Sequence, residues 1–310
     1  MRVGIFGGTG FIGSHLAKKL SSRGDKIEIF SRQKTLPENL SAISGIKLIT
    51  YDRINRVSLE GFDILINLAG EPIIGGRWTE ERKKKLFSSR VDLTKEIVSE
   101  LLQARNKPSL FLQGSAIGYY GFWENDSLRF TENSKPGTDF LAELCVRWEK
   151  ESEPLGKAGI RTGIIRTGIV LSKKGGALAK MLPPFRMMLG GPIGSGKQTM
   201  SWIHIDDMTS GIIFLIDNKK ISGTFNFTAP NPVSNEVFTR ALADVLRRPA
   251  PFRVPDFALK LLFGEGSAVV SRGQNVFPED LEKAGYRFRF RMIEDALGDL
   301  LRGGENRIDP

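Results

Sequence analysis

A glycine-rich turn near the start of the chain constrains its fold more than any other feature. The turn Gly7-Gly8-Thr9-Gly10-Phe11-Ile12-Gly13 follows the apolar run Arg2–Phe6, which we predict to be a strand. It opens the segment Phe11–Ser22, whose apolar spacing predicts a helix. A strand, a tight glycine turn and a helix in this order are typical of the first unit of a dinucleotide-binding domain.

The turn has the chemistry of a pyrophosphate site. A side chain at its tightest point would block the anion, Gly10 lets the backbone approach it, and Gly13 lets the helix pack closely against the strand. The first N–H groups of the helix lack partners within the helix, and the helix dipole is positive at this end. We predict that Gly7, Gly10, Phe11, Ile12 and Gly13 bind the cofactor. The alternative is a glycine-rich turn without a ligand.

The end of the second predicted strand distinguishes the two nicotinamide dinucleotides. Enzymes that use NAD usually carry Asp or Glu here, about 20 residues after the turn, to hold the ribose hydroxyls. In this chain Ser31 and Arg32 follow the predicted strand 26–30. A carboxylate would repel a ribose phosphate, whereas a hydroxyl and a guanidinium bind it. We therefore predict NADP(H), bound by Ser31 and Arg32; the alternative is that Arg32 is only a surface residue beside Lys34.

A cation also lies on an apolar helix face. Segment 79–104 is predicted to be helical, and Arg90 falls on the stripe formed by Leu86, Leu93, Ile97 and Leu101. A cation on an inward-facing stripe needs a partner. A cofactor phosphate is one candidate, and a structural carboxylate such as Asp52 or Asp63 is the other.

The remaining segments follow one another as in a parallel α/β domain. Short apolar runs and helical patterns alternate over the first 170 residues, which predicts βαβ units. Further strands are expected at 47–50, 64–67, 110–114 and 162–166, and a further helix at 139–155. Glycine and proline turns follow, and then short helical patterns at 235–246, 257–263, 279–284 and 292–301.

We therefore predict an α/β fold, with a Rossmann-type doubly wound parallel sheet and a smaller, mostly helical C-terminal substrate lobe. The dinucleotide-binding domain is expected to span residues 1–170, with part of 197–228 returning to it. Residues 171–196 and 229–310 would form the lobe. The glycine-rich loop 190–196 lacks the spacing of a phosphate-binding P-loop, and we expect it to be mobile and to cover the substrate.

Composition excludes several classes of function. A lone cysteine, Cys145, and two histidines, His15 and His204, leave no internal disulfide and predict no metal site. The net charge of +10 comes from scattered basic residues that do not interleave with aromatic residues, so we expect no nucleic-acid partner. No apolar run approaches the roughly 20 residues of a membrane-spanning helix, and no secretory signal is recognisable. We expect a cytoplasmic protein without a membrane partner.

Several segments of the sequence resemble those of a known family. They are the glycine turn, Asn67-Leu68-Ala69-Gly70, Ser201-Trp202-Ile203-His204-Ile205-Asp206-Asp207 and Gly223-Thr224-Phe225-Asn226-Phe227. Together they resemble the extended short-chain dehydrogenase/reductase superfamily. Segments 67–72, 77–79, 114–121, 139–148 and 178–196 are more closely similar to its atypical "epimerase family protein" branch, which is NAD-dependent epimerase/dehydratase-like and NADP-binding.

The resemblance implies an extended Rossmann fold and places more residues at the cofactor. It implies that Leu68 and Ala69, with Gly70 in the same loop, line the adenine–ribose side. It also implies that the strand ending near Ser115 abuts the nicotinamide, and that Val170 flanks the cofactor after the sixth strand. Relatives in this superfamily often pair, so a homodimer is possible.

The usual proton relay of the superfamily is missing from its expected place. Most members use a Ser or Thr, a Tyr that serves as acid or base, and a Lys four residues after the Tyr. The Tyr position falls on Phe140 or Leu141, and the Lys position falls on Leu144 or Cys145. Neither position supplies a phenol or an amine.

Other residues are candidates for the chemistry. The serine position falls on Ser115 or, one register away, on Ala116. Tyr119 and Tyr120 follow near the expected nicotinamide end, and one could act as a general acid if its pKa were tuned; packing at a loop is the alternative. We predict Ser115 and Tyr119 as catalytic residues, and expect Glu143 to be solvated.

The remaining candidates have mainly structural interpretations. We interpret Cys145 as an inert core thiol because it lies on the apolar face of its helix. His204 and Asp206 resemble an acid–base pair, but we favour a structural role for them where the two lobes join. Three cations could meet an anionic substrate, with surface charge as the alternative: Lys180, Arg186 and Lys197.

Two functional hypotheses follow. The first is an NADP(H)-dependent oxidoreductase or epimerase-like enzyme that acts on an unidentified polar small molecule, such as a nucleotide sugar or a carbonyl compound. The second is a binding protein that senses NADP(H) without chemistry, which the missing Tyr and Lys favour. A basic nucleic-acid binder is a third and less favoured hypothesis.

Overall fold

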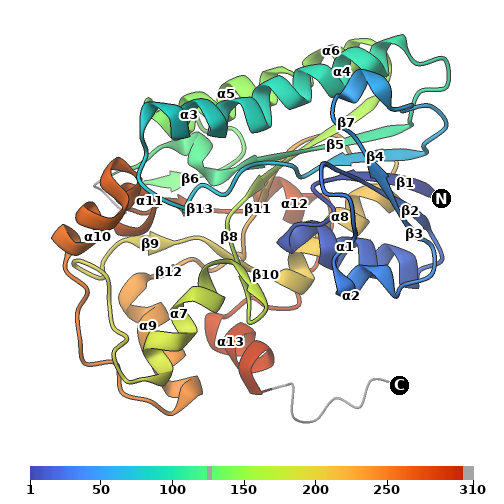
Figure 1. Cartoon of the computed structure of the whole chain (residues 1–310). Helices are drawn as coiled ribbons and strands as arrows, with labels where there is room; N and C mark the ends of the chain where they lie inside the picture. Colours follow the sequence, from blue (N-terminus) through green and yellow to red (C-terminus); the bar gives the residue numbers. More distant parts are fainter. Residues whose placement is uncertain (124–127, 303–310) are drawn as a thin grey trace.

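A central parallel sheet organises residues 1–123 and 128–302, which are the residues that the computed structural model describes (Figure 1). Its seven strands have the order β11-β7-β5-β4-β1-β2-β3. The strands are β1 (Arg2–Phe6), β2 (Lys26–Ser31), β3 (Ile46–Thr50), β4 (Ile64–Asn67), β5 (Leu110–Ala116), β7 (Arg161–Thr167) and β11 (Gly223–Phe227). The chain order reverses between β1 and β4, and ligands of such sheets bind at the carboxyl ends of the strands at this point.

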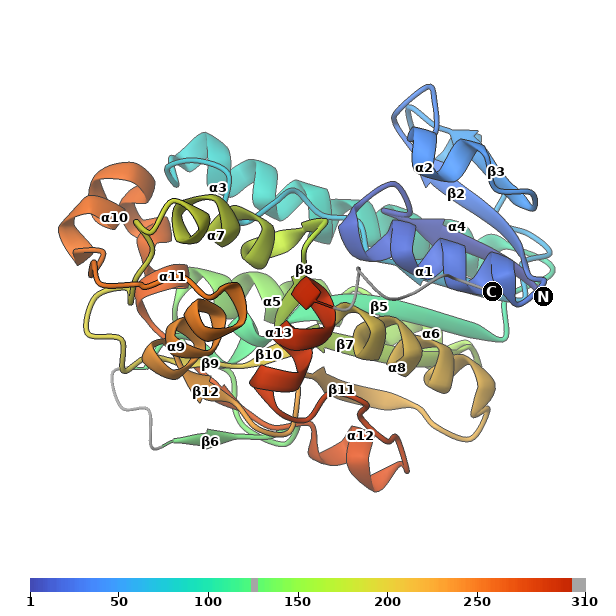
Figure 2. The ribbon, with the colours of Figure 1, turned by 90° about the horizontal axis from the view of Figure 1, so that it is seen from below.

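Helices cover both faces of the sheet (Figure 1). One face carries α1 (Phe11–Ser22), α2 (Glu38–Ser41) and α8 (Ile205–Asp217). The other carries α3 (Glu80–Phe87), α4 (Leu93–Gln103), α5 (Phe140–Lys150) and α6 (Glu153–Lys157). Figure 2 shows α1 and α8 side by side, where Lys19 donates a hydrogen bond to Ser210 Oγ. The predicted Rossmann-type doubly wound fold is confirmed.

The strands are buried on both faces, which explains why they appear in the sequence as continuous apolar runs. Successive side chains of a strand point to opposite faces. On β1, Ile5 therefore packs in the core beneath α1, whereas Phe6 packs in the core beneath α4. The Phe6 ring stacks on Phe30 of β2 with ring centroids 4.4 Å apart.

Two predicted helices are interrupted. The predicted helix 79–104 consists of α3, a π-helical turn η2 (Ser88–Asp92) and α4. Such turns within helices frequently occur at functional sites. The predicted helix 139–155 ends at Lys150, and Pro154 lies in the first turn of the separate helix α6, where the missing N–H of proline costs nothing.

The region after residue 168 holds more regular structure than the sequence predicts. Helix α7 (Gly176–Arg186) continues through Pro183 and Pro184, which by themselves favour a turn. Burial of Leu178, Leu182 and Phe185 in the core offsets the lost backbone hydrogen bonds. Short parallel strands β8 (Ile169–Ser172) and β10 (Trp202–His204) then pair outside the main sheet.

The C-terminal part is mostly helical, as predicted, and it packs directly on the sheet. Its helices are α9 (Asn235–Leu246), α10 (Asp256–Phe263), α11 (Ala268–Ser271), α12 (Glu279–Lys283) and α13 (Ile293–Arg302). Short strand pairs join it to earlier segments: β9 (Thr199–Met200) with β12 (Val233–Ser234), and β6 (Arg129–Phe130) with β13 (Asn275–Val276). Three 3-10 turns complete the described elements: η1 (Ile54–Arg56), η3 (Ile117–Tyr120) and η4 (Gly264–Ser267).

The predicted lobe shares one hydrophobic core with the sheet. Phe238 of α9 and Leu297 of α13 belong to the same buried cluster as Ile5 and Leu112 of the sheet. In the part of the chain that the structure describes, no helix is both long and apolar enough to cross a bilayer.

A buried carboxylate ties the C-terminal segment to helix α8. Asp207 Oδ1 accepts hydrogen bonds from the Tyr286 hydroxyl at 3.0 Å and from the Arg289 backbone N–H at 2.9 Å. Its Oδ2 accepts one from the Phe290 backbone N–H at 2.8 Å. Because donors face both oxygens, an amide at this position would have to direct its NH2 group at a donor.

We expect Asp207→Asn to lower the free energy of unfolding by about 1.5–3 kcal/mol, the range for hydrogen bonds to a charged group. Urea denaturation followed by circular dichroism measures this. Asp217→Asn on the same helix is the matched control, because Asp217 is half exposed and its ion pair with Arg23 contributes little. Equal losses in the two variants would contradict the tethering role.

Candidate functional site

Two cavities meet at the carboxyl edge of the sheet, and Leu68 borders both. The first, which we call the polar cavity, has a volume of about 530 Å³ and lies along the glycine turn and the end of β2. The second, the apolar cavity, has a volume of about 390 Å³ and lies between β5, α5 and α7. Residues of the polar cavity include Gly7, Thr9, Gly10, Ser31, Arg32, Tyr51, Ala69, Gly70 and Lys85. Residues of the apolar cavity include Ile12, Arg90, Ser115, Leu141, Leu144, Cys145, Trp148 and Met181.

The glycine turn has no room for side chains at two of its positions. Gly7 has a φ of +75°, and a Cβ atom there would lie 2.7 Å from the backbone of Leu68 and Ala69. A Cβ atom on Gly13 would lie 2.3 Å from the Gly7 carbonyl oxygen. The turn therefore packs directly against the loop after β4, and it brings the start of α1 to the edge of the sheet.

The start of α1 is left open toward the polar cavity. Gly10 is its N-cap residue and provides no side-chain cap, and the first turn of the helix carries no acid. Its N–H groups therefore remain available to an anion. Of the two predicted contacts that follow, Ile12 lines the apolar cavity, whereas the Phe11 ring packs against Gly175 and Gly176. Only the backbone of Phe11 is thus placed for the predicted role.

The end of β2 carries a hydroxyl and a guanidinium, and both line the polar cavity. Ser31 is buried, and its Oγ accepts a hydrogen bond from the Gln33 backbone N–H at 3.1 Å. Arg32 is exposed. Burial raises the pKa of the neighbouring Tyr51, and the charge of Arg32 opposes this shift. The Arg32 guanidinium therefore lies close enough to Tyr51, a lining residue of the polar cavity, to influence the pKa of its phenol.

The polar cavity also carries carboxylates, which sequence reasoning did not place there: Asp52, Glu71, Asp92 and Glu96. Glu71 pairs with Arg82 at 2.8 Å, and this hydrogen bond is the main reason that the pKa of Glu71 is lowered. The carboxylates come from the loops after β3 and β4 and from the helices above them, so they do not occupy the end of β2.

The π-helical turn directs Arg90 into the protein, where its partners are backbone carbonyls. Its guanidinium donates to the Glu71 carbonyl at 2.9 Å and to the Leu86 carbonyl at 3.3 Å. It also lies 5.3 Å from the centre of the Trp148 ring. Burial lowers the pKa of Arg90 to about 10. The hydrogen bonds of Arg90 to Glu71 and Leu86 thus go to the protein backbone rather than to Asp63. The proposed contact with a cofactor phosphate stays a prediction, and Arg90 lines the apolar cavity.

Ser115 opens onto the apolar cavity and belongs to a buried polar network. Its hydroxyl donates to Glu149 Oε1 at 2.6 Å. Glu149 is also held by Arg166 through two contacts of 2.8 Å. Arg166 Nη1 donates to the Tyr120 hydroxyl, which in turn donates to Asn226 Oδ1 at 2.7 Å. The network extends from the cavity wall across β7 to β11.

Sequence reasoning missed Glu149 and Arg166 and considered Glu143 instead. Glu143 is exposed and pairs with Arg147, as expected of a solvated residue. Glu149 follows the buried Cys145 by one helical turn, and this spacing is the signal that could have revealed it. The ring of Tyr119 lies 3.4 Å from the Arg166 guanidinium carbon, and Tyr119 is not among the lining residues of the apolar cavity. Its placement therefore argues against the predicted role as a general acid.

Helix α5 presents apolar groups to the cavity, at the place where relatives with the usual relay carry a phenol and an amine. The groups are Leu141, Leu144, Cys145 and Trp148. Burial raises the pKa of the Cys145 thiol to about 12, so it stays protonated at neutral pH and is a poor nucleophile. This agrees with its interpretation as an inert core thiol.

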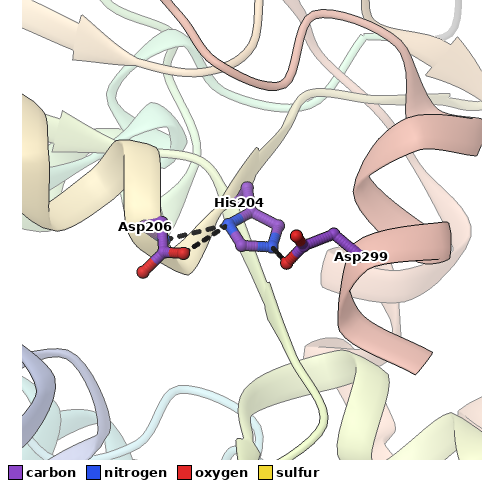
Figure 3. Close-up of side chains that lie close together, drawn as sticks. All are labelled: His204, Asp206 and Asp299. Carbon is purple, nitrogen blue, oxygen red and sulfur yellow. Dashed lines mark hydrogen bonds and ion pairs between the residues drawn. The ribbon is translucent and has the colours of Figure 1, made fainter. Parts of the chain in front are cut away.

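His204 is a buried cap, and the structure gives it partners on both sides of its ring (Figure 3). Nδ1 accepts a hydrogen bond from the Asp206 backbone N–H at the start of α8, and Nε2 lies 3.5 Å from Asp299 Oδ2. Asp206 itself binds Lys19 and His15. One ligand-type atom of each of the three residues lies within 4.8 Å of the other two, and Figure 3 shows the two carboxylates on opposite sides of the imidazole. The arrangement supports the structural role rather than an acid–base pair.

The structure differs from the expectations for Val170 and for loop 190–196. Val170 is buried in the main core on β8 and does not line either cavity. Loop 190–196, expected to be mobile, is held by backbone hydrogen bonds to the segment around Val254. Gly194 N–H donates to Val254 O at 2.9 Å, and Val254 N–H donates to Pro192 O at 2.8 Å. Ile193 N–H donates to Asn235 Oδ1 at 2.7 Å, so the loop is part of the cavity wall.

Comparison with known proteins identifies the family. A family model described as NAD dependent epimerase/dehydratase matches residues 3–227. The chain belongs to this family. A second model, described as a domain of unknown function (DUF1731), matches residues 254–300. The resemblance inferred from the sequence is thereby confirmed.

Named relatives extend over almost the whole length of this epimerase-family chain. The chain is 39% identical to the chloroplastic epimerase family protein SDR39U1 homolog of Arabidopsis thaliana, over 97% of this chain and 87% of that protein. It is 37% identical to epimerase family protein YfhF of Bacillus subtilis, over 97% and 98% of the two chains. A crystal structure of human epimerase family protein SDR39U1 with NADPH superposes with a TM-score of 0.89 at 31% identity, covering 99% and 100% of the two chains.

The buried ion pair between Glu149 and Arg166 leads to a prediction about stability. Glu149→Gln would leave the Arg166 charge uncompensated, so we expect the free energy of unfolding to fall by about 3–5 kcal/mol. Glu143→Gln, on the same helix, removes an exposed pair and should cost less than about 1 kcal/mol. Denaturant unfolding of both variants measures the difference. A loss in Glu149→Gln as small as that in Glu143→Gln would contradict the structural weight given to the pair.

His204 leads to a pH prediction. Burial lowers its pKa from 6.5 to about 4, although Asp206 and Asp299 oppose the shift. The neutral ring thus stabilises the fold above pH 6.5, and this contribution is lost as the pH falls toward 4. His204→Asn keeps a side-chain acceptor for the helix cap but does not titrate. Between pH 6.5 and 4 we expect its free energy of unfolding to fall by on the order of 3 kcal/mol less than that of the unmodified chain. Urea midpoints at each pH test this, and parallel curves for the two proteins would refute it.

Proposed function

We propose that the chain binds NADP(H) across the two cavities and is an oxidoreductase or epimerase-like enzyme. The carrying observation is the polar cavity, which combines an open helix N-terminus with Ser31 and Arg32 at the end of β2. A carboxylate in that place would favour the free ribose hydroxyls of NAD, whereas Arg32 favours a phosphate. The NADPH bound by human SDR39U1, at 31% identity, supports the same choice.

The residues present fit such a cofactor. The N–H groups at the start of α1 would hold the pyrophosphate, since Gly7 and Gly10 leave that position without side chains. Arg32 would hold the ribose phosphate, and Lys85 also lines the polar cavity. The nicotinamide end would then lie in the apolar cavity, because Leu68 borders both spaces and Ser115 lines the second.

When bound, the nicotinamide supplies or accepts a hydride. The chain would contribute a hydrogen-bonding group at the reacting oxygen, and Ser115 is the candidate. Because the Ser115 hydroxyl donates its proton to Glu149, its oxygen would act as the acceptor for a substrate hydroxyl. Arg166 holds Glu149 in a fixed orientation through two hydrogen bonds. Ser115 and Glu149 would thereby take over the positioning that the Tyr and Lys provide in other members.

A second function has a specific observation in its favour. Helix α5 presents neither phenol nor amine to the apolar cavity. A protein that binds NADP(H) and signals its presence without chemistry would need neither. The two functions differ in one measurable property, which is the transfer of deuteride from labelled NADPH to an added carbonyl compound. Transfer would support the enzyme, and tight binding without any transfer would support the sensor.

Arg32→Ala tests the cofactor preference. Ligands that bind the native state raise the melting temperature by mass action, so thermal shifts with NADPH, NADP, NADH and NAD report relative affinity. We expect the variant to lose about 1.5–3 kcal/mol of binding free energy for the phosphorylated forms only, as for a hydrogen bond to a charged group. Lys34→Ala, an exposed neighbour outside the cavity lining, is the matched control. Equal shifts for NADPH and NADH in the unmodified chain would overturn the preference.

A further inference from the structure

The wall of the apolar cavity carries few charged side chains. Among its described lining residues there is no Asp, Glu or Lys. Its lining residues come from the sheet edge, α5, α7 and α11, among other segments. The apolar side chains that surround it include Ile73, Phe122, Leu144, Met181, Val269 and Val270.

We propose that this cavity takes an uncharged and mainly hydrocarbon alcohol or carbonyl compound, and not a nucleotide sugar. The proposal rests on the proposed function for the cofactor and deepens it. It revises the expectation of a polar substrate that the sequence suggested.

The first argument concerns charge. A nucleotide sugar carries a diphosphate, and a buried anion needs cations or several hydrogen-bond donors. The lining holds two cations, Arg90 and Arg272, and both already have partners within the protein. The pyrophosphate of the cofactor is accommodated elsewhere, at the start of α1. A second diphosphate would therefore meet a wall without a cation to spare in its described residues.

The cations suggested from the sequence do not fill this gap. Lys180 is exposed, and its Nζ donates to the Ile74 carbonyl at 3.3 Å. Arg186 and Lys197 are exposed as well, and neither is among the lining residues. Interpretation as surface charge, the alternative given for these residues, therefore fits the structure better.

The second argument concerns space. Pockets for small molecules usually have volumes of about 300–1,000 Å³. The apolar cavity, at about 390 Å³, is near the lower end of that range, and the nicotinamide would occupy part of it. What remains suits a compact hydrocarbon group better than a sugar joined to a nucleoside diphosphate.

Ser115 provides a polar point at which the reacting oxygen can bind. In the oxidation direction, the carbinol C–H bond of the alcohol would break and the hydrogen would leave with its electron pair as hydride, for which the oxidised nicotinamide of NADP would be the acceptor. The alcohol O–H proton moves to Ser115 Oγ while the Ser115 proton moves to Glu149 Oε1, and the carbon–oxygen double bond forms. Reduction is the reverse, so atoms and charge balance in both directions.

The test compares two sets of probes on the full chain in the presence of NADPH or NADP. One set is cyclohexanol with cyclohexanone and benzyl alcohol with benzaldehyde; the other is UDP-glucose with UDP-galactose. Thermal shift measures binding, and absorbance of the reduced nicotinamide measures hydride transfer. We expect the first set to raise the melting temperature of the cofactor-bound chain and to be turned over, and the second set to do neither.

A charged variant locates the binding. Met181→Lys places an ammonium on the cavity wall, and it should weaken binding of the first set at least about tenfold because burying an unpaired charge is costly. Met187→Lys is the matched control, since Met187 is 60% exposed at the end of the same helix. Met187→Lys should respond to NADPH alone as the unmodified chain does.

The outcomes separate the two proposals. Binding or turnover of the UDP-sugars, or no binding of the apolar probes while NADPH still stabilises the chain, would overturn the substrate class and leave the cofactor assignment intact. Apolar probes that bind equally to Met181→Lys and Met187→Lys would also overturn it. Failure of NADPH and NADP to stabilise the chain would overturn the proposed function itself. Binding of the apolar probes without hydride transfer would keep the ligand class and favour the sensor over the enzyme.

Discussion

The close contact between the glycine turn and the loop after β4 is the constraint on which the rest of the structure depends. Gly7 and Gly13 leave no space for a Cβ atom, so the start of α1 lies against the sheet edge with its N–H groups uncapped. That position fixes where an anion can bind. It also fixes the distance from the anion site to the end of β2 on one side and to Ser115 on the other.

A second constraint is the burial of charge beside the reaction site. Glu149 and Arg166 are both almost inaccessible to solvent, and such pairs rarely add net stability, because desolvation offsets their attraction. Their value here is geometric. The pair fixes the direction of the Ser115 hydroxyl on β5. The α5 side chains that face the same cavity are apolar. Glu149 is itself outside the described cavity lining and is connected to the cavity through the Ser115 hydroxyl.

The sequence predicted the sheet well and the site only in part. For six of the seven strands the predicted ends were correct to within about two residues, because strands buried on both faces give continuous apolar runs bounded by turns. The seventh, β11, was not predicted as a strand. The glycine turn and Arg32 were recognisable because their chemistry depends on local order. Glu149 and Arg166 are far apart in the sequence and meet only across β5 and β7, so no local pattern could pair them. Helix α7 was missed because local proline signals were overridden by tertiary burial.

The core that the sheet shares with α9 and α13 has a consequence for motion. Two lobes with separate cores can rotate about a hinge to admit and release ligands. Here the same buried cluster runs through both parts, and loop 190–196 is pinned by backbone hydrogen bonds. Rotation would have to break this packing, so the cleft is preformed, and ligands should exchange through local side-chain rearrangements at its rim. Ligand selectivity would then be set by the shape of a rigid cavity rather than by closure of the protein around the ligand.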